Sequence, residues 1–343
     1  MKVSVVVVNW NRRDLLRACL KSLFRQTEPE FEIIVVDNGS VDGSVEMVAR
    51  EFAQVRLIQN RENRGFCAAN NQGIRASSAT FVALLNNDAE AESRWLASLR
   101  AALEVRPNFG MAASKILVWE KPEIIDKAGH LIYPDGQNRG RGSGERDNGQ
   151  YDHVEEALWP DGCAAMYRRD MLTAIGGFDE DLFAYADDAE LGLRARIAGW
   201  RCVYVPSAVA RHHRGATLGL GSARRLRLIE RNRVLLAAKL FPWSLLWLNA
   251  PYYLARLASG AWAALRGRGE ASLYPGAAGK VTIAAALIRG DCEALFMLPR
   301  MLRKRREVER IRKLSARETR ELILGSRISL RALSGQTTAG GHV

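Results

Sequence analysis

Two aspartates follow apolar runs in the first ninety residues, at points where a strand would end. Asp37 comes directly after Phe31–Val36, and Asp88 follows Phe81–Leu85 and two asparagines. A carboxylate beside amides suits a hard divalent cation whose other ligands are phosphate oxygens, so Asp88 is a candidate metal ligand. Asp37 is placed to accept a hydrogen bond from a base or a ribose. Each has an ordinary alternative, because Asp37 can form the turn of Asp-Asn-Gly-Ser and Asp88 can cap a helix over 89–92.

Further along the chain, a pair of acids and a pair of histidines could also do chemistry. Asp187 and Asp188 are adjacent in a half-apolar segment. Adjacent carboxylates raise one another's pKa, which favours a general base near neutral pH. The alternative is a solvated helix start, where acids are favourable at the positive end of the dipole. His212 and His213 follow the apolar run Cys202–Val205, and a histidine after a strand and near carboxylates is a candidate metal ligand, although a lone histidine is more often structural.

The elements that must position these residues alternate between strands and helices. Continuous β-branched runs predict strands, and apolar residues at helical spacing predict helices. The predicted strands are Val3–Val8, Phe31–Val36, Val55–Ile58 and Phe81–Leu85, and the predicted helices are Asp14–Gln26, Ser44–Phe52 and one containing Asn70–Ala76. This alternation predicts an α/β fold with a mostly parallel central sheet covered by helices on both faces. Such sheets bind ligands at the carboxyl ends of their strands, where the polar clusters 9–11, 37–39 and 86–88 fall.

Composition places the chain among globular proteins. Of its 343 residues, 48% are hydrophobic and 26% are charged, which excludes intrinsic disorder of the whole chain. The five cysteines include no C-x-x-C pair, which excludes a disulfide scaffold and a cysteine zinc site. We expect all five to be small buried hydrophobes, at Cys19, Cys67, Cys163, Cys202 and Cys292. The N-terminal apolar run is too short for a secretory signal, so we expect a cytosolic protein.

The net charge of +12 is unevenly distributed. Residues 1–209 carry a net charge of −5, and residues 210–343 carry one of +17. A strongly basic C-terminal part indicates an anionic partner, such as nucleic acid or anionic lipid. Its basic residues are interleaved with leucine and alanine rather than with stacking aromatics, which argues against nucleic acid. We therefore expect an anionic membrane surface as a partner, and no nucleic acid.

Residues 134–150 are rich in glycine and arginine. The spacing of Gly140, Gly142 and Gly144 resembles a phosphate-binding loop, but no strand pattern precedes it and no helix pattern follows. We expect a mobile loop or an excursion between strands. The rest of the sequence contains no dinucleotide-binding motif, which argues against a dehydrogenase.

From about residue 221 the sequence pattern is helical. The uncharged stretch Leu240–Ala255 would span about 24 Å as a helix, less than the roughly 30 Å of a bilayer's hydrocarbon core, and two prolines interrupt it. We expect an element that lies at a membrane interface, with the basic cluster Arg300–Arg306 as a second anchor. The aromatic residues at headgroup level would be Trp243, Trp247, Tyr252 and Tyr253. The alternatives are a buried helical hairpin against the sheet domain and a contact between two copies of the chain.

The order of the polar motifs resembles that of family 2 inverting glycosyltransferases with the GT-A fold, and most of all their bacterial rhamnosyltransferase-like branch. The matching stretches are 5–11, 35–40, 60–71, 84–88 and, most specific, 176–200 with Gly176-Gly177-Phe178-Asp179-Glu180, Asp187-Asp188 and Gly199-Trp200. Arg231-Asn232-Arg233 resembles the branch more loosely. The resemblance implies a GT-A catalytic domain over 1–220, a helical, basic region over 221–333 that associates with membrane or oligomerises, and a disordered tail over 334–343.

The resemblance also implies roles for the matched residues. Donor binding would fall to Asn9, Asp37, Arg64, Gly65, Asn70, Asn86 and Asp88. Asp88 and His212 would bind Mg²⁺ or Mn²⁺, which neutralises charge on the departing diphosphate. Asp188 would deprotonate the acceptor hydroxyl. The residues expected to contact the acceptor or support the base are Trp159, Asp161, Asp187 and Glu190.

Two residues depart from the family pattern. Asp187 stands where the family commonly has glutamate, so its side chain is one methylene shorter. Asn86 replaces the first aspartate of the D-x-D motif, which removes one negative charge, and the branch often has this asparagine too. We therefore expect weak metal affinity, with much of the metal arriving on the donor.

The resemblance implies transfer of L-rhamnose from dTDP-rhamnose to a hydroxyl of a lipid-linked or cell-surface glycan, at the inner face of the cell membrane. Two alternatives remain open. One is the same fold with a UDP-sugar donor, such as UDP-galactofuranose or UDP-N-acetylglucosamine. The other is a non-catalytic scaffold that binds nucleotide sugars and recruits partners in glycan assembly.

Overall fold

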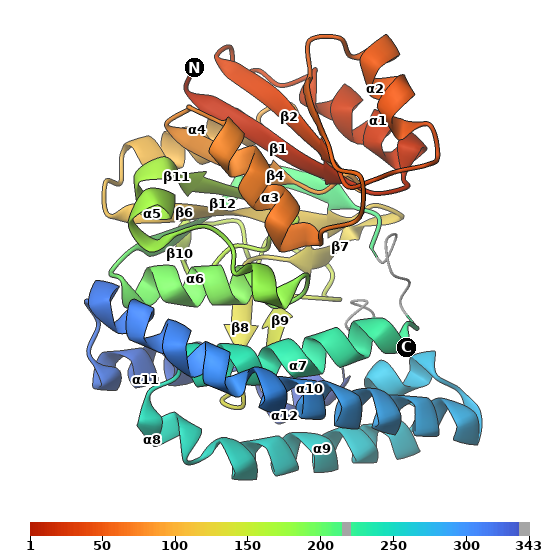
Figure 1. The fold of residues 1–343 in the computed structure, drawn as a ribbon, viewed down its shortest axis with the longest axis vertical. Coiled ribbons are helices and arrows are strands. Elements are labelled where there is room, and N and C mark those ends of the chain that lie inside the picture. The colour runs from red at the N-terminus through yellow and green to blue at the C-terminus, as the bar shows by residue number, and fades with distance from the viewer. Residues whose placement is uncertain (215–220, 336–343) are drawn as a thin grey trace.

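The structure is a computed structural model that describes residues 1–214 and 221–335. Strands alternate with helices in the first two thirds of the chain, and the last third is helical (Figure 1). The strands are β1 (Val3–Asn9), β2 (Phe31–Asp37), β3 (Arg56–Gln59), β4 (Phe81–Leu85), β5 (Ala89–Ala91), β6 (Phe109–Val118), β7 (Lys121–Lys127), β8 (His130–Ile132), β9 (Asn138–Gly140), β10 (Glu155–Ala157), β11 (Ala164–Arg168) and β12 (Arg201–His212). The α-helices are α1 (Arg13–Leu23), α2 (Ser44–Glu51), α3 (Phe66–Ala76), α4 (Trp95–Glu104), α5 (Arg169–Ile175), α6 (Asp187–Ile197), α7 (Ala223–Leu240), α8 (Trp243–Leu246), α9 (Asn249–Leu265), α10 (Gly276–Ile311), α11 (Ala316–Gly325) and α12 (Leu330–Gly335). Two short 3₁₀ helices are η1 (Glu180–Leu182) and η2 (Gly269–Leu273).

One mixed sheet organises the first two thirds of the chain, in the order β10-β12-β6-β11-β4-β1-β2-β3. The strands β4, β1, β2 and β3 are parallel, as are β6 and β12, whereas β11 runs antiparallel between β4 and β6. The parallel half matches the predicted strand–helix alternation within a few residues. The α/β fold with a mostly parallel sheet expected from the sequence is therefore confirmed, with antiparallel strands added in the later part of the sheet.

Both faces of the sheet are covered, which explains why β1 is a continuous apolar run. Val5 and Val7 pack on one side with α1, α2 and α4, while Val6 packs on the other side with α3, α5 and α6. In Figure 1 α7 lies below α6, and α10 runs alongside α7. The helical C-terminal region thus forms a further layer on the α6 side, at the end of the molecule away from β1 and β2.

Three sequence predictions are wrong in detail. Residues 89–91 form β5, which pairs with β12, so Asp88 ends a strand-to-strand turn and caps no helix. Residues 138–140 form β9, which pairs with β8, so a strand does precede the glycine-rich segment, and this segment is an excursion between strands. Cys292 is exposed on α10, whereas the other four cysteines are buried as expected.

The uncharged stretch 240–255 is divided among three helices. Leu240, Phe241 and Leu245 are fully buried where α7 ends and α8 begins, while Trp243 and Trp247 are exposed. The stretch therefore packs partly against the protein and partly faces outward. Within the described residues, no helix is both long and apolar enough to cross a membrane. Of the tail expected to be disordered, Ser334 and Gly335 belong to α12, and 336–343 lie outside the described residues.

Candidate active site

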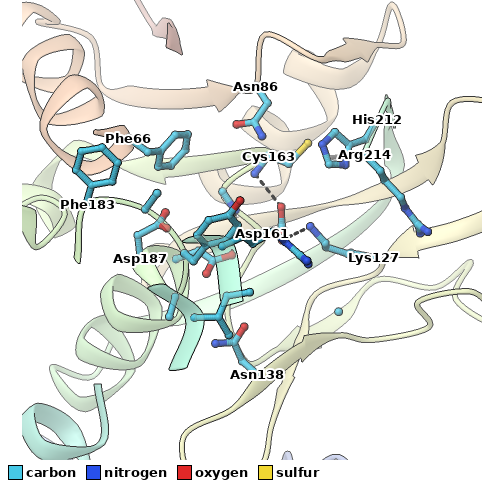
Figure 2. A pocket seen from close by; sticks show the side chains of 18 of the residues that line it. Phe66, Asn86, Lys127, Asn138, Asp161, Cys163, Phe183, Asp187, His212 and Arg214 are labelled. Atoms are coloured by element: carbon cyan, nitrogen blue, oxygen red, sulfur yellow. Dashed lines mark hydrogen bonds and ion pairs between the residues drawn. The ribbon is translucent and has the colours of Figure 1, made fainter. Parts of the chain in front are cut away.

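A cavity of about 350 Å³ opens at the carboxyl ends of β1 and β4, between α6 and the start of α7. Parallel strands direct their following loops to this edge, which is why polar residues from distant segments meet there. The sequence-predicted residues that line it are Gly65, Asn86, Asp88, Asp161, Asp187, Asp188 and His212. Figure 2 shows Asn86 and His212 on one side of the cavity, Asp161 and Asp187 in its middle, and Asn138 across from Asn86.

Asp88 and His212 form the part of the cavity that fits a divalent cation. The β5–β12 pairing brings His212 Nε2 to 3.4 Å from Asp88 Oδ1. Asp88 Oδ1 is buried and has no hydrogen-bond partner among the described residues, as expected of an oxygen that accepts a metal ion. His212 Nδ1 lies 2.7 Å from Asp126, an arrangement that fixes the ring of a metal-binding histidine. Burial opposes ionisation of Asp88, but His212 outweighs it and lowers the pKa of Asp88 below its usual value.

His213 faces away from this pair. Its ring stacks on Trp119 with the centroids 4.5 Å apart, and its Nδ1 lies 3.4 Å from Glu120. Of the two adjacent histidines, His212 is therefore the one that reaches Asp88.

A second cluster lies in the middle of the cavity. His130 Nε2 is 2.8 Å from Asp161 Oδ2 and 3.3 Å from Asp188 Oδ2, and Lys127 Nζ is 2.7 Å from Asp161 Oδ2. Burial disfavours the charged ring, but Asp188 and Asp161 outweigh it and raise the pKa of His130 to about 9. Ligand atoms of His130, Asp161 and Asp188 lie within 4.8 Å of one another, a spacing that a metal ion could also use. Here the chain supplies its own cations, because Lys127 and protonated His130 balance the two carboxylates.

Asp187 and Asp188 begin α6 after a loop with unusual backbone angles. Phe183, Tyr185 and Ala186 have φ values of 66°, 68° and 54°. These lie in the left-handed region, which is unfavourable for residues other than glycine. Burial, and then the neighbouring Asp188, raise the pKa of Asp187 to about 8. The two carboxylates therefore differ in environment, since Asp188 contacts His130 and the backbone N–H of Gly162.

Helix α7 and the loop after β3 hold this strained loop on its two sides. The side-chain nitrogen of fully buried Asn232 lies 2.9, 2.8 and 2.7 Å from the carbonyl oxygens of Leu182, Ala184 and Tyr185. On the other side, a Cβ at Gly65 (φ +86°) would approach the Phe183 ring to 2.5 Å, so only glycine permits this contact. We refer to 182–186 as the strained loop.

Four residues expected to bind the donor do not line the cavity. Asn9 and Asp37 are buried and bond to each other at 3.0 Å, and Asp37 also accepts from the backbone of Ser40 at 2.8 Å, as a turn-forming aspartate does. Asn70 donates to the carbonyl of Phe66 within α3. Arg64 is exposed, and its backbone N–H bonds to Asn38.

Two residues expected near the acceptor are also enclosed. Glu190 is 1% exposed and pairs with Arg194 at 2.8 Å and Lys239 at 2.7 Å, which joins α6 to α7. Trp159 is fully buried, and its ring stacks on His130 with the centroids 6.0 Å apart. Trp159 therefore supports the middle cluster from behind.

Sequence reasoning missed Asp126, Lys127 and His130, which the structure brings to the centre of the cavity. The signal was available in Asp126-Lys127-Ala128-Gly129-His130, three titratable residues directly after the apolar pair of Ile124 and Ile125. From the sequence, Asn232 was named only as part of Arg231-Asn232-Arg233 and was given no role. A polar amide on the buried side of a helix rich in Leu and Arg indicates a tertiary hydrogen bond.

A mixed sheet whose strand ends carry a carboxylate–histidine pair, with a further carboxylate nearby, is the arrangement expected of the GT-A class of α/β domains. Sequence comparison is consistent with this class. The family model described as Glycosyl transferase family 2 matches residues 4–176, half of the chain, and that of Glycosyl transferase family group 2 matches 153–288. The chain belongs to glycosyltransferase family 2.

Curated relatives match the same region. The N-acetylglucosaminyl-diphospho-decaprenol L-rhamnosyltransferase of Mycobacterium tuberculosis is 28% identical over 245 residues, which are 65% of this chain and 79% of that protein. The uncharacterized protein y4gI of Sinorhizobium fredii is 30% identical over 237 residues, 63% of this chain, but the match spans only 25% of y4gI. The mycobacterial relative supports the rhamnosyltransferase-like branch.

A solved structure supports the fold. The mannosyltransferase PcManGT from Pyrobaculum calidifontis, in complex with GDP-Man and Mn²⁺, superimposes with a TM-score of 0.51 at 22% identity, over 86% of this chain and 87% of its own. Because the coverage is high for both chains, the likeness extends beyond the sheet into the C-terminal helices.

Proposed function

We propose that the protein is a metal-dependent inverting glycosyltransferase that moves a sugar from a nucleotide-sugar donor to an acceptor hydroxyl. The observation that carries the proposal is the meeting of Asp88 and His212 in one cavity with Asp188. In this assignment Asp88 and His212 hold Mg²⁺ or Mn²⁺, which supplies charge neutralisation for the leaving nucleoside diphosphate. The Mn²⁺ named for the mannosyltransferase structure supports this choice of cofactor.

Asp188 acts as the general base. It lies in the cavity with an oxygen directed toward His130 and Gly162, so its orientation is fixed by two contacts. A fixed carboxylate can take the proton of the attacking hydroxyl, and a single displacement then inverts the anomeric carbon. Asp187, whose pKa is raised to about 8, supports the helix start in its neutral form at neutral pH.

The donor is dTDP-L-rhamnose and the acceptor is a lipid-linked or cell-surface glycan. The mycobacterial relative, named for transfer of L-rhamnose to a diphospho-decaprenol acceptor, supports both assignments. Asn86, Gly65 and Asp88 line the cavity on the donor side, while Asn9, Asp37 and Asn70 act behind them by fixing the loops. Arg64 is exposed, and its assignment to the donor rests on the sequence motif alone.

The surface formed by α8, α9 and α10 rests on an anionic membrane, at the cytoplasmic face. Exposed apolar residues occur along all three helices: Trp243, Trp247, Leu254, Trp262, Leu265, Val281, Ile288, Leu295, Phe296 and Leu302. Among the described side chains between residues 243 and 306, every exposed charged one is basic: Arg266, Arg268, Lys280, Arg289, Arg300, Arg303 and Arg306. Apolar side chains combined with cations are what an anionic lipid surface attracts. We call this the α8–α10 surface.

The deciding experiment is donor binding by calorimetry in the presence of Mn²⁺ or Mg²⁺. We expect the wild type to bind dTDP-rhamnose more tightly than UDP-galactofuranose or UDP-N-acetylglucosamine. Asp88→Ala should lose this binding, because the metal and with it the diphosphate lose their carboxylate. Asp188→Asn should keep donor binding but lose turnover by about 10²–10⁴-fold, the range for general-base catalysis.

Three outcomes would contradict parts of this proposal. Preference for a UDP-sugar would overturn the donor. Full turnover of folded Asp188→Asn would overturn the base. If the folded wild type binds no nucleotide sugar with either metal, the non-catalytic scaffold becomes the better description.

A further inference from the structure

The cations that line the cavity are not all neutralised. Lys127 pairs with Asp161 at 2.7 Å, and Arg214 pairs with Asp126 at 2.9 Å. Two more pairs close the α7 side, Arg225 with Glu270 at 2.9 Å and Arg233 with Glu230 at 2.7 Å. The two other arginines of the lining, Arg139 and Arg224, have no carboxylate within ion-pair distance in the described part of the chain.

Arg139 is an unusual arginine because part of its guanidinium is enclosed. It lies on β9, and its Nε is buried and has no hydrogen-bond partner among the described residues. Burial lowers the pKa of Arg139 to about 10, against the opposing effect of Glu270, so it stays charged at neutral pH. Its Nη1 donates to the carbonyl of Asn138 at 3.3 Å, which leaves Nε as the unpartnered donor. A buried, charged donor without an acceptor is costly, and an anionic ligand would remove that cost.

Arg224 is exposed and lies in the first turn of α7, which contains no acidic residue. Its guanidinium lies 5.6 Å from the centroid of the Phe183 ring, which directs it toward the strained loop. A cation at the positive end of a helix is unfavourable. Arg224 and Arg139 are thus two arginines without an ion pair among the described residues, and both line the same cavity, from α7 and β9.

These two arginines come from segments that adjoin the proposed base. Arg139 on β9 pairs with Leu131 on β8, next to His130, whose Nε2 is 3.3 Å from Asp188. Arg224 lies over the ring of Phe183, in the loop that leads into Asp187 and Asp188. Figure 2 shows Asn138, the neighbour of Arg139 on β9, across the cavity from Asn86. In an inverting displacement the base contacts the acceptor hydroxyl, and the departing nucleoside diphosphate lies on the opposite side of the anomeric carbon. A ligand held by Arg139 and Arg224 is therefore on the acceptor's side.

We propose that Arg139 and Arg224 form an anion subsite that binds a phosphate or diphosphate group of the acceptor. This inference rests on the proposed function for the identity of the ligand, which is a glycan whose reducing end carries a diphosphate on a lipid. Arginine suits this task because its planar guanidinium binds two phosphate oxygens at once. The acceptor's lipid would leave the cavity beside α7, on the C-terminal side that carries the α8–α10 surface.

The test measures two diphosphates separately on the full chain. Farnesyl diphosphate, in metal-free buffer with EDTA, probes the proposed lipid-diphosphate subsite, and dTDP with Mn²⁺ probes the donor subsite. The variants are Arg139→Gln, Arg224→Gln and both together. The matched control is Arg266→Gln, an exposed arginine of the chain outside the cavity lining.

We expect each single variant to weaken farnesyl diphosphate binding by about tenfold or more, as for loss of a charge-assisted hydrogen bond. Binding of dTDP should change by less than about twofold, and Arg266→Gln should behave as wild type. The proposal is overturned if the wild type does not bind farnesyl diphosphate, if the double variant binds it unchanged, or if only dTDP affinity falls.

Two features keep the test decisive. If Arg139→Gln does not fold, Arg224→Gln alone decides, because that side chain is exposed. If dTDP binds to no variant but farnesyl diphosphate binding depends on the arginines, the donor assignment of the proposed function fails and the anion subsite stands.

Discussion

At the scale of single residues, the centre of the cavity depends on His130. This ring touches two carboxylates, Asp161 at 2.8 Å and Asp188 at 3.3 Å, and its pKa is raised to about 9. At neutral pH it is therefore a cation that holds the proposed base in place. Its Nδ1 is buried without a partner in the described part of the chain, so the ring's orientation is set by Nε2 and by stacking on Trp159.

This arrangement predicts a pH-dependent stability. The folded-state pKa of His130 lies above its unfolded value of about 6.5, so the stabilisation is fully present below pH 6.5 and is lost as pH rises through about 9. His130→Gln removes this contribution, which we estimate at roughly 2–3 kcal/mol. Thermal unfolding measured from pH 6 to about 9.5 should show a steeper loss for wild type than for His130→Gln.

The matched control is His153→Gln, since His153 is exposed and its ring lies 3.7 Å from Glu155. Its unfolding curve should follow that of wild type across the range. Parallel pH curves for wild type and His130→Gln would show that the ring is neutral in the folded state.

Whether a site residue could be predicted depended on the residues next to it in the sequence. Asp88 and Asp188 could be identified because each stands at the end of a recognisable motif. His130 could not, because its importance comes from a contact across 58 residues that only the fold of β8 against α6 creates. Asp37 was assigned to the donor, but the competing turn geometry accounts for its hydrogen bonds.

At the scale of elements, α7 and the strained loop act together. Asn232 satisfies three carbonyls of a loop whose residues at 183, 185 and 186 adopt left-handed angles. Such angles cost on the order of 1–3 kcal/mol each and persist only where neighbouring contacts enforce them. Because Asp187 and Asp188 directly follow the loop, the amide of Asn232 positions the proposed base without touching substrate.

Asn232→Ala should therefore lower turnover more than donor binding. We expect kcat to fall by about tenfold or more while the donor Kd stays within about twofold, together with about 1–3 kcal/mol of lost stability. Asn249→Ala is the control, because the Asn249 amide also donates to a carbonyl, that of Asp135, but away from the loop. If kcat falls only in proportion to the unfolded fraction, Asn232 has a structural role alone.

The parallel half of the sheet could be predicted because each strand is a short apolar run with its own helix. Four later strands, β5, β8, β9 and β10, could not be predicted, since each has only three residues and pairs antiparallel. Short polar strands such as Asn138–Gly140 carry no period-2 pattern, so their pairing is decided by distant partners. The segment 134–150 was consequently assigned to a loop, although Asn138 and Arg139 line the cavity.

At the scale of the whole molecule, acidic and basic charge are separated along the chain. The acidic part, residues 1–209, contains the proposed metal ligand Asp88 and base Asp188, and the basic part contributes the α8–α10 surface. Among the described side chains between residues 243 and 306, seven exposed ones are cations and none is an acid, whereas the last turns of α10 carry the exposed acids Glu307 and Glu309. The part of the surface that bears the tryptophans therefore has one sign of charge. A single sign of charge beside exposed tryptophans favours lipid headgroups over a neutral partner.

Vesicle co-sedimentation tests this surface. Wild type should bind phosphatidylglycerol-rich vesicles, should bind less as salt increases, and should not bind phosphatidylcholine vesicles. Replacing Trp247 and Trp262 by alanine should weaken binding by about tenfold or more, since each loses a large buried apolar area at the interface. Trp119→Ala is the control, because Trp119 is 41% exposed on the catalytic part.

Two other results would assign the surface differently. Equal binding to duplex DNA would favour nucleic acid. A dimer in solution that the Trp247/Trp262 variant dissociates, without vesicle binding, would make the surface an interface between two copies of the chain.

The ion pairs between the segment 179–190 and the C-terminal helices also limit how such chains can be recombined. Asp179, 6% exposed, pairs with Lys239 and Lys304, and Glu190 shares Lys239 with Arg194. A chain cut near residue 220 would lose both lysines. Glu190 would keep Arg194, but Asp179 would be left as a buried charge without a cationic partner, at a cost of several kcal/mol. A tail taken from another family member would therefore have to bring lysines at the same places.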